Sequence, residues 1–247
     1  MQVTKWNMPN QLKSYIYITK YARDMNRNFI KSNLGIIVAI GSVWGLTEFA
    51  FGLGLQKCAT LYTGAILTGL AFFWLSMIWS ITKSIIPILI IIGITMLFKW
   101  LDALLLQVAW NHGSIVNPIY AFFTIMIGFT LLLLLFRKRF SKNLLSRILV
   151  GAGGAAIACA LFPLAKFTTG NPACLYAATN IPLTIYTAPV AIILSMITVP
   201  LGFRAATWYT EKTQGVNSER SGSLLARLWS PAVVICCLLI ITLVRII

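Results

Sequence analysis

Apolar residues run through this chain in seven long segments that are separated by polar stretches. Each segment approaches the roughly 20 residues that an α-helix needs to cross the core of a bilayer. The pattern therefore predicts an all-α fold, a polytopic bundle of about seven transmembrane helices. The predicted spans are 34–55, 59–82, 85–107, 117–136, 145–164, 182–203 and 224–246.

The first 33 residues follow a different pattern. Apolar residues recur there at three- and four-residue spacing from Leu12 to Phe29, and lysines and arginines occupy the other faces. This spacing is typical of an amphipathic helix in the plane of the lipid headgroups, and a disordered basic tail is the alternative. We expect residues 1–33 to form an interfacial leader on the cytoplasmic side. Residues 34–247 are expected to form a single transmembrane domain.

Composition agrees with a lipid environment. Hydrophobic residues make up 59% of the 247 positions and charged residues only 10%, whereas a soluble domain carries about 25% charged residues. The formal net charge is +15, which could indicate a nucleic-acid partner. In so apolar a chain we expect the basic residues to contact anionic membrane lipids instead, and we expect no nucleic-acid partner.

The positions of lysine and arginine predict the orientation. If all seven segments cross the membrane, sixteen of these residues fall on one side and three on the other. Cytoplasmic connections carry the excess of positive charge. We therefore expect a multi-pass protein of the inner (cytoplasmic) membrane, with the N-terminus in the cytoplasm.

Three charged residues lie well inside the predicted spans: Glu48, Lys99 and Asp102. An ionisable side chain within the membrane normally faces protein and has a partner or a function. Lys99 and Asp102 are three residues apart on one helix, so they are neighbours on one face. We expect them to form a pair within that helix.

Small residues indicate where helices approach each other closely. Gly41, Gly45, Glu48 and Gly52 share one face of the first predicted helix, so Glu48 should point at protein rather than lipid. Gly151 and Ala155 have the same four-residue spacing in the fifth predicted helix, which favours a second close helix contact.

Depth places the three charges in one layer. All three lie roughly 8–12 Å below the outer surface, counted along helices that rise about 1.5 Å per residue. Tyr62, Asn117 and Tyr120 begin neighbouring helices in the same zone, and the outer connection 165–181 is a candidate lid or an ordinary connector. The layer is interpreted as a ligand-binding pocket. The alternative is a buried network that only holds the helices together.

Motifs for catalysis or a cofactor do not occur in the sequence. There is no G-x-S-x-G, no H-E-x-x-H and no pair of C-x-x-C motifs, and the chain has one histidine. We therefore expect no enzyme activity, no catalytic residue, no metal site and no cofactor. An intramembrane enzyme that uses Glu48 and Asp102 as acid and base is the weakest hypothesis, because no nucleophile accompanies them.

Two stretches resemble a known family. The run Gly41-Ser42-Val43-Trp44-Gly45-Leu46-Thr47-Glu48 and the run Asn117-Pro118-Ile119-Tyr120-Ala121 are similar to the membrane-embedded substrate-binding (S) components of energy-coupling factor transporters. The resemblance implies a helical bundle that binds a vitamin or metal near its outer face. It also implies docking on a transmembrane partner subunit through Gly41 and Gly45, with separate ATPases supplying the energy. The family has six spans and alanines at the docking face, where this chain has seven predicted spans and glycines.

These features lead to a functional hypothesis. The chain is expected to be a transport-related protein that takes up a small-molecule ligand from the outer face and has no ATPase of its own. A non-catalytic structural subunit of a larger membrane complex is the alternative, with partner subunits docked on the glycine-rich faces.

Overall fold

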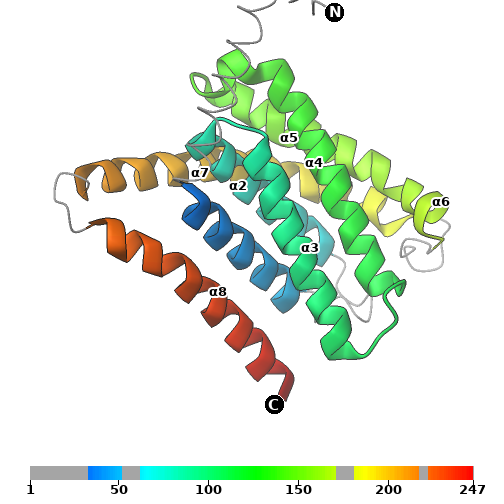
Figure 1. Ribbon diagram of the computed structural model, residues 1–247. Helices are drawn as coiled ribbons and strands as arrows, with labels where there is room; N and C mark the ends of the chain where they lie inside the picture. Colours follow the sequence, from blue (N-terminus) through cyan, green and yellow to red (C-terminus); the bar gives the residue numbers. More distant parts are fainter. Residues whose placement is uncertain (1–32, 52–61, 171–180, 217–221, 247) are drawn as a thin grey trace, which may run out of the picture. The chain divides into compact units, whose positions relative to one another are not determined.

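The computed structural model describes residues 33–51, 62–170, 181–216 and 222–246, which belong, apart from residues 33 and 34, to one compact unit (Figure 1). These residues form helices and no strand, which confirms the predicted all-α fold. The predicted interfacial helix of the leader lies outside the described residues. The helices are helix 33–51, which carries no label in Figure 1, α2 (Thr63–Thr82), α3 (Ile86–Leu106), α4 (Gly113–Phe140), α5 (Leu144–Leu161), η1 (Phe162–Leu164), α6 (Ala165–Thr169), α7 (Leu183–Val216) and α8 (Gly222–Ile246).

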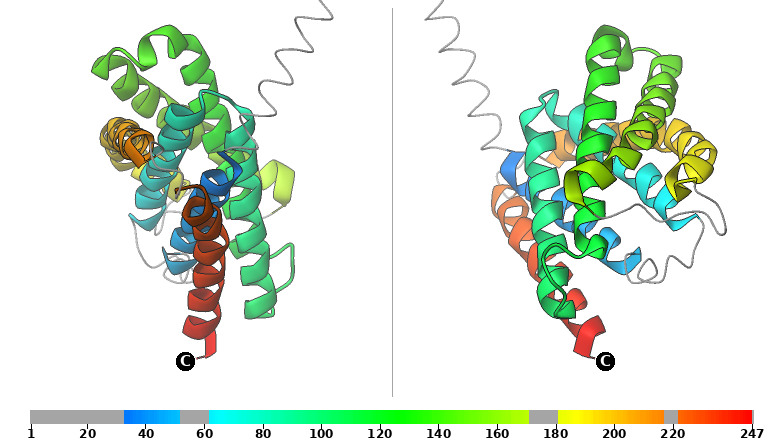
Figure 2. Two further views of the ribbon diagram at one scale, coloured as in Figure 1. Left: turned by 60° about the vertical axis from the view of Figure 1, so that its left-hand side comes forward. Right: turned by 90° about the vertical axis from the view of Figure 1, so that its right-hand side faces the viewer.

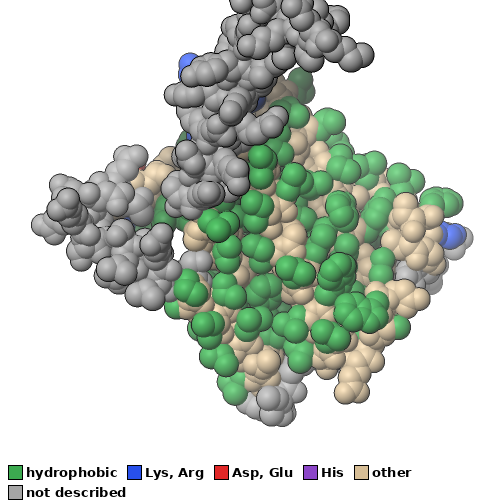
Figure 3. All heavy atoms as spheres, in the orientation of Figure 1, with side chains coloured by type: hydrophobic (Ala, Val, Ile, Leu, Met, Phe, Trp, Pro, Cys, Tyr) green, Lys and Arg blue, Asp and Glu red, His purple; other side chains and the backbone are tan. Residues whose placement is uncertain are grey.

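Six helices in the described ranges are long and apolar enough to cross a membrane. The predicted seventh span corresponds to α8, whose apolar part in the described residues, Pro231–Leu243, is shorter. Large apolar side chains also cover the outside of the protein, and Figure 3 shows a face dominated by them. Leu135 and Phe167 are 74% and 82% exposed, which suits lipid and not water. The chain is a multi-pass α-helical membrane protein.

Several predicted boundaries differ from the structure. Helix α2 begins at Thr63, four residues after the predicted start, and the helical stretch from Leu144 continues through η1 and α6 to Thr169, five residues beyond the predicted end. Helix α4 begins at Gly113, four residues before the predicted start, because His112 caps it: the Ser114 N–H donates to His112 Nδ1 at 3.3 Å. Helix α7 continues to Val216, thirteen residues beyond the predicted end of its span. Its 34 residues measure about 51 Å, more than the roughly 30 Å of a bilayer core.

The core helices α2, α4, α5 and α7 pack against one another, as the ribbon views show (Figure 2), and glycines allow them to approach closely. A Cβ on Gly128 of α4 would meet the backbone of Gly154 in α5, and a Cβ on Gly151 would meet the Ser195 carbonyl in α7. Gly202 of α7 approaches the backbone of Phe73 in α2 in the same way. Van der Waals packing of this kind drives helix association in lipid, where no hydrophobic effect favours it. These contacts position α2, α4, α5 and α7 against one another.

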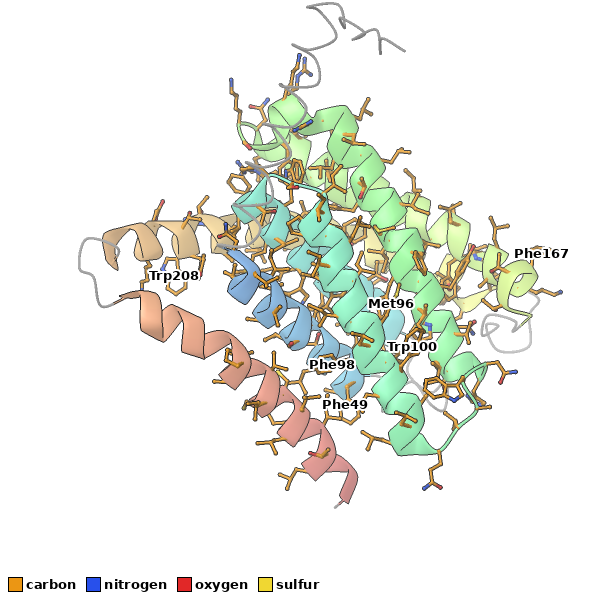
Figure 4. The ribbon with its side chains drawn as sticks, viewed as in Figure 1. Phe49, Met96, Phe98, Trp100, Phe167 and Trp208 are labelled. Atoms are coloured by element: carbon orange, nitrogen blue, oxygen red, sulfur yellow. The ribbon has the colours of Figure 1, made fainter. Side chains whose placement is uncertain are left out.

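A second group of contacts joins helix 33–51, α3 and α8. Phe49, Phe98, Cys237 and Ile241 form a buried apolar cluster, and Figure 4 shows Phe49 and Phe98 together in it. Phe49 comes from helix 33–51, Phe98 from α3, and Cys237 and Ile241 from α8, so the cluster fixes how the three helices face each other. It also lies beside the residues that carry the buried charges.

Candidate functional site

Glu48 is buried inside the protein and has a partner on its own helix. Only 6% of its surface is exposed, and its Oε1 accepts a hydrogen bond of 3.2 Å from Trp44 Nε1, one turn earlier. Trp44 is fully buried and meets the Phe122 ring of α4 edge-on, with the ring centroids 5.7 Å apart. The buried Trp44 side chain therefore holds the Glu48 carboxyl in a fixed position inside the bundle.

Lys99 of α3 supplies a positive charge to the same region. Only 5% of its surface is exposed, and its ammonium group acts electrostatically on the Glu48 carboxyl. Opposite charges attract strongly where water is excluded, so each lowers the free energy needed to bury the other. The structure therefore brings together one acid and one base that the sequence places 51 positions apart.

The glycine face of helix 33–51 packs against α3. A Cβ on Gly45 would lie 2.6 Å from Phe98 Cγ, and one on Gly41 would lie 3.1 Å from Ile94 Cβ. Thr95 Oγ1 donates to the Ile91 carbonyl of its own helix at 2.9 Å and lies 3.5 Å from the Gly41 carbonyl. Glu48 follows Gly45 on this face, which explains why it meets α3. Gly41 and Gly45 therefore contact α3 of the same chain. A helix of a partner subunit would have to dock on a different surface.

The third predicted charge, Asp102, lies one turn after Lys99 in α3. Its side chain and the whole of Gly52 lie outside the described part of the structure. Both the Lys99–Asp102 pair and the place of Gly52 on the glycine face therefore stay predictions.

The three polar residues predicted to lie near the charges, Tyr62, Asn117 and Tyr120, have different surroundings in the structure. Tyr62 precedes α2 and is 49% exposed. Tyr120 is directed to the end of α5, where its hydroxyl donates to the Leu161 carbonyl at 3.4 Å and its ring meets Phe162. Asn117 has a buried Oδ1 that accepts no hydrogen bond from the described residues. Of these three residues, only Asn117 has a buried polar atom that makes no hydrogen bond to the described residues.

The other small-residue face, on α5, is also used within the chain. Gly151 lies against the Ser195 carbonyl of α7, and Ala155 is fully buried one turn later. Cys159, a further turn along, packs with Ala65 of α2 and Ala191 of α7. This face of α5 is therefore a helix contact inside the bundle.

Sequence reasoning missed Trp44 as the partner of Glu48. The signal was available, because residues four apart on a helix are neighbours and an indole N–H needs an acceptor when it is buried. Phe98 and Phe122 could not be found in this way, because they come from other helices.

The site has the groups for binding a charged or polar molecule and little else. Among the described residues no three His, Cys, Asp or Glu side chains are grouped where they could hold a metal ion. The chain matches no family of known proteins, no curated protein and no solved structure. The function must therefore be argued from the buried charges themselves.

Proposed function

We propose that this protein is a transport-related membrane protein that binds a small solute at Glu48 and Lys99 and has no ATPase of its own. The observation that carries the proposal is the burial of an acid and a base, from two helices, among described buried side chains that are otherwise uncharged. A charge near the centre of a span costs about 2.5–3.5 kcal/mol on insertion scales. Packing alone could be achieved with apolar residues, so the retained charges favour a binding role.

The direction of binding follows from the sequence-based depth and orientation. In the proposed orientation the N-terminus is cytoplasmic, the membrane is the inner membrane, and Glu48 and Lys99 lie nearer the outer face. A solute with both a positive and a negative group would complement the pair.

A structural subunit of a larger membrane complex is the second proposal, and the packing around the charges favours it. Trp44 is fully buried, and Gly41 and Gly45 bring α3 into close contact beside Glu48. In this case the Glu48–Lys99 pair would hold helix 33–51 and α3 in register.

Neutralising Glu48 separates the two proposals. The full-length protein is purified in detergent as wild type, Glu48→Gln and Glu211→Gln, where Glu211 is an exposed glutamate that serves as the matched control. Native mass spectrometry reports any bound molecule that is not a lipid or detergent, and thermal unfolding reports stability. A binding role predicts a bound molecule in the wild type and in Glu211→Gln that is lost in Glu48→Gln, with little change in Tm.

The double variant Glu48→Gln/Lys99→Gln completes the test. A purely structural pair predicts that Glu48→Gln alone leaves a buried lysine charge and lowers Tm, and that the double variant recovers much of the loss. The solute-binding proposal is wrong if the wild type carries no such molecule and the stability follows this structural pattern.

A further inference from the structure

Cations gather at the end of the bundle where α2 and α4 end and α5 begins. Helix α2 ends there at Thr82, α4 ends at Phe140, α5 begins at Leu144, and Phe203 of α7 lies among them. The two cations with the most contacts to this end are Lys83 and Arg147. The exposed cations around them are Arg137, Lys138, Arg139, Lys142 and Arg204.

Arg147 is fixed by contacts on several sides. Its Nε donates to the Phe140 carbonyl at 2.9 Å, and its Nη2 donates to the Ser141 carbonyl at 2.8 Å, which satisfies the end of α4. Its guanidinium carbon lies 3.4 Å from the centroid of the Phe203 ring. The guanidinium group is therefore held in one orientation at the edge of the bundle.

Lys83 approaches the same ring and the same loop. Its backbone is left-handed (φ 52°) and ends α2, with the N–H bonded to the Trp79 carbonyl. Its Nζ lies 5.5 Å from the Phe203 centroid and donates to Ser141 Oγ at a long 3.5 Å. Burial, and after it the nearby Arg147 charge, lowers the pKa of Lys83 below its usual value. Two cations are thus held close together at the end of the bundle where α2 and α4 end and α5 begins.

Within the described ranges, the contacts of the two side chains are the Ser141 hydroxyl, two backbone carbonyls and the Phe203 ring, and none of these is a carboxylate. Such a pair offers positive charge and hydrogen-bond donors to an anion. A phosphate group fits it best, because a guanidinium and an ammonium group both bind phosphate oxygens. Leu145 and Leu149, 66% and 41% exposed, are one turn apart on α5, and Leu149 follows Arg147 toward the membrane, so this face offers an apolar surface next to the cations.

We propose that the phosphate headgroup of an anionic phospholipid binds between Lys83 and Arg147, with its acyl chains against the apolar surface of α5. The apolar neighbours favour a lipid over free phosphate. The binding does not depend on the function of Glu48, so it stands apart from the solute-binding proposal. The lipid would link the ends of α2, α4 and α5 and remove the repulsion between the two cations.

The test uses the full-length protein in detergent, titrated with dioleoyl-phosphatidylglycerol, with zwitterionic dioleoyl-phosphatidylcholine and with inorganic phosphate. Native mass spectrometry gives the affinity for each lipid, and the Tm shift reports binding of either lipid or of phosphate. The variants are Lys83→Gln and, as matched control, Lys142→Gln, which removes the same charge from an exposed position in the loop between α4 and α5. Circular dichroism checks that each variant is folded.

We expect phosphatidylglycerol to bind more tightly than phosphatidylcholine. Lys83→Gln should weaken phosphatidylglycerol binding about five-fold, the effect of one basic residue near an anionic membrane surface, and Lys142→Gln should weaken it much less. Equal weakening by the two variants, or equal binding of the two lipids, would overturn the proposal. Stabilisation by inorganic phosphate as strong as by phosphatidylglycerol, and lost in Lys83→Gln, would overturn the lipid as the source of the phosphate.

Discussion

The close approach of helix 33–51 to α3 can be tested by adding one methyl group at Gly45. A Cβ there would lie 2.6 Å from Cγ, 2.9 Å from Cβ and 2.9 Å from Cδ2 of Phe98. Carbon atoms in ordinary contact are about 3.5–4.0 Å apart, so Phe98 must move by about 1 Å. Rotation of the ring cannot relieve the contact with Phe98 Cβ. Gly45→Ala therefore has to push α3 away from helix 33–51.

The size of the effect follows from two opposing contributions. Overpacking a well-packed contact costs about 1–3 kcal/mol. Replacing glycine by alanine inside a helix contributes about 0.5–1 kcal/mol of stability in return. Gly93 of α3 provides the control, because a Cβ at that position would meet none of the described atoms within 4 Å. Only the second contribution applies to Gly93→Ala, so the two variants should differ by about 1–3 kcal/mol.

Thermal unfolding in detergent, followed by tryptophan fluorescence, measures this difference. At about 2–4 °C for each kcal/mol in a protein of this length, Gly45→Ala should unfold roughly 2–12 °C below Gly93→Ala. Gly45→Ala should also disturb the neighbouring Glu48 and weaken binding of any solute there. Equal melting temperatures for the two variants would refute the close packing of Gly45 on Phe98.

Two further predictions concern the core and the orientation. Ser76 Oγ donates a 2.7 Å hydrogen bond from α2 to the Val199 carbonyl of α7, so Ser76→Ala should lower stability by about 0.6–1.7 kcal/mol. Ser80→Ala, which removes a buried hydroxyl with no partner among the described residues, should not lower it; equal losses of Tm would contradict this. Single cysteines placed at the exposed positions 142 and 211 of a cysteine-free chain should react only with reagents on the cytoplasmic side, and labelling from outside would reverse the proposed orientation.

The long apolar segments were sufficient to predict the all-α membrane fold and the approximate helix positions. The physical reason is local, because a backbone in lipid must satisfy its hydrogen bonds within its own helix, so an apolar run of sufficient length becomes a helix. Helix ends were predicted less well. His112 caps α4 earlier than the apolar run begins, and α7 continues through polar residues because nothing in that stretch stops a helix.

The candidate site was predicted only in part for a related reason. Depth along a helix can be counted in the sequence, and the spacing of Gly41, Gly45 and Glu48 indicates which face of the helix meets protein. Neither the depth nor the spacing says how one helix is rotated relative to another. Only the tertiary structure decided that the glycine face meets Ile94 and Phe98 of α3, since that choice depends on how side chains from distant segments fit together. The grouping of Lys83, Arg147 and Phe203 from three separate helices depends on the same packing.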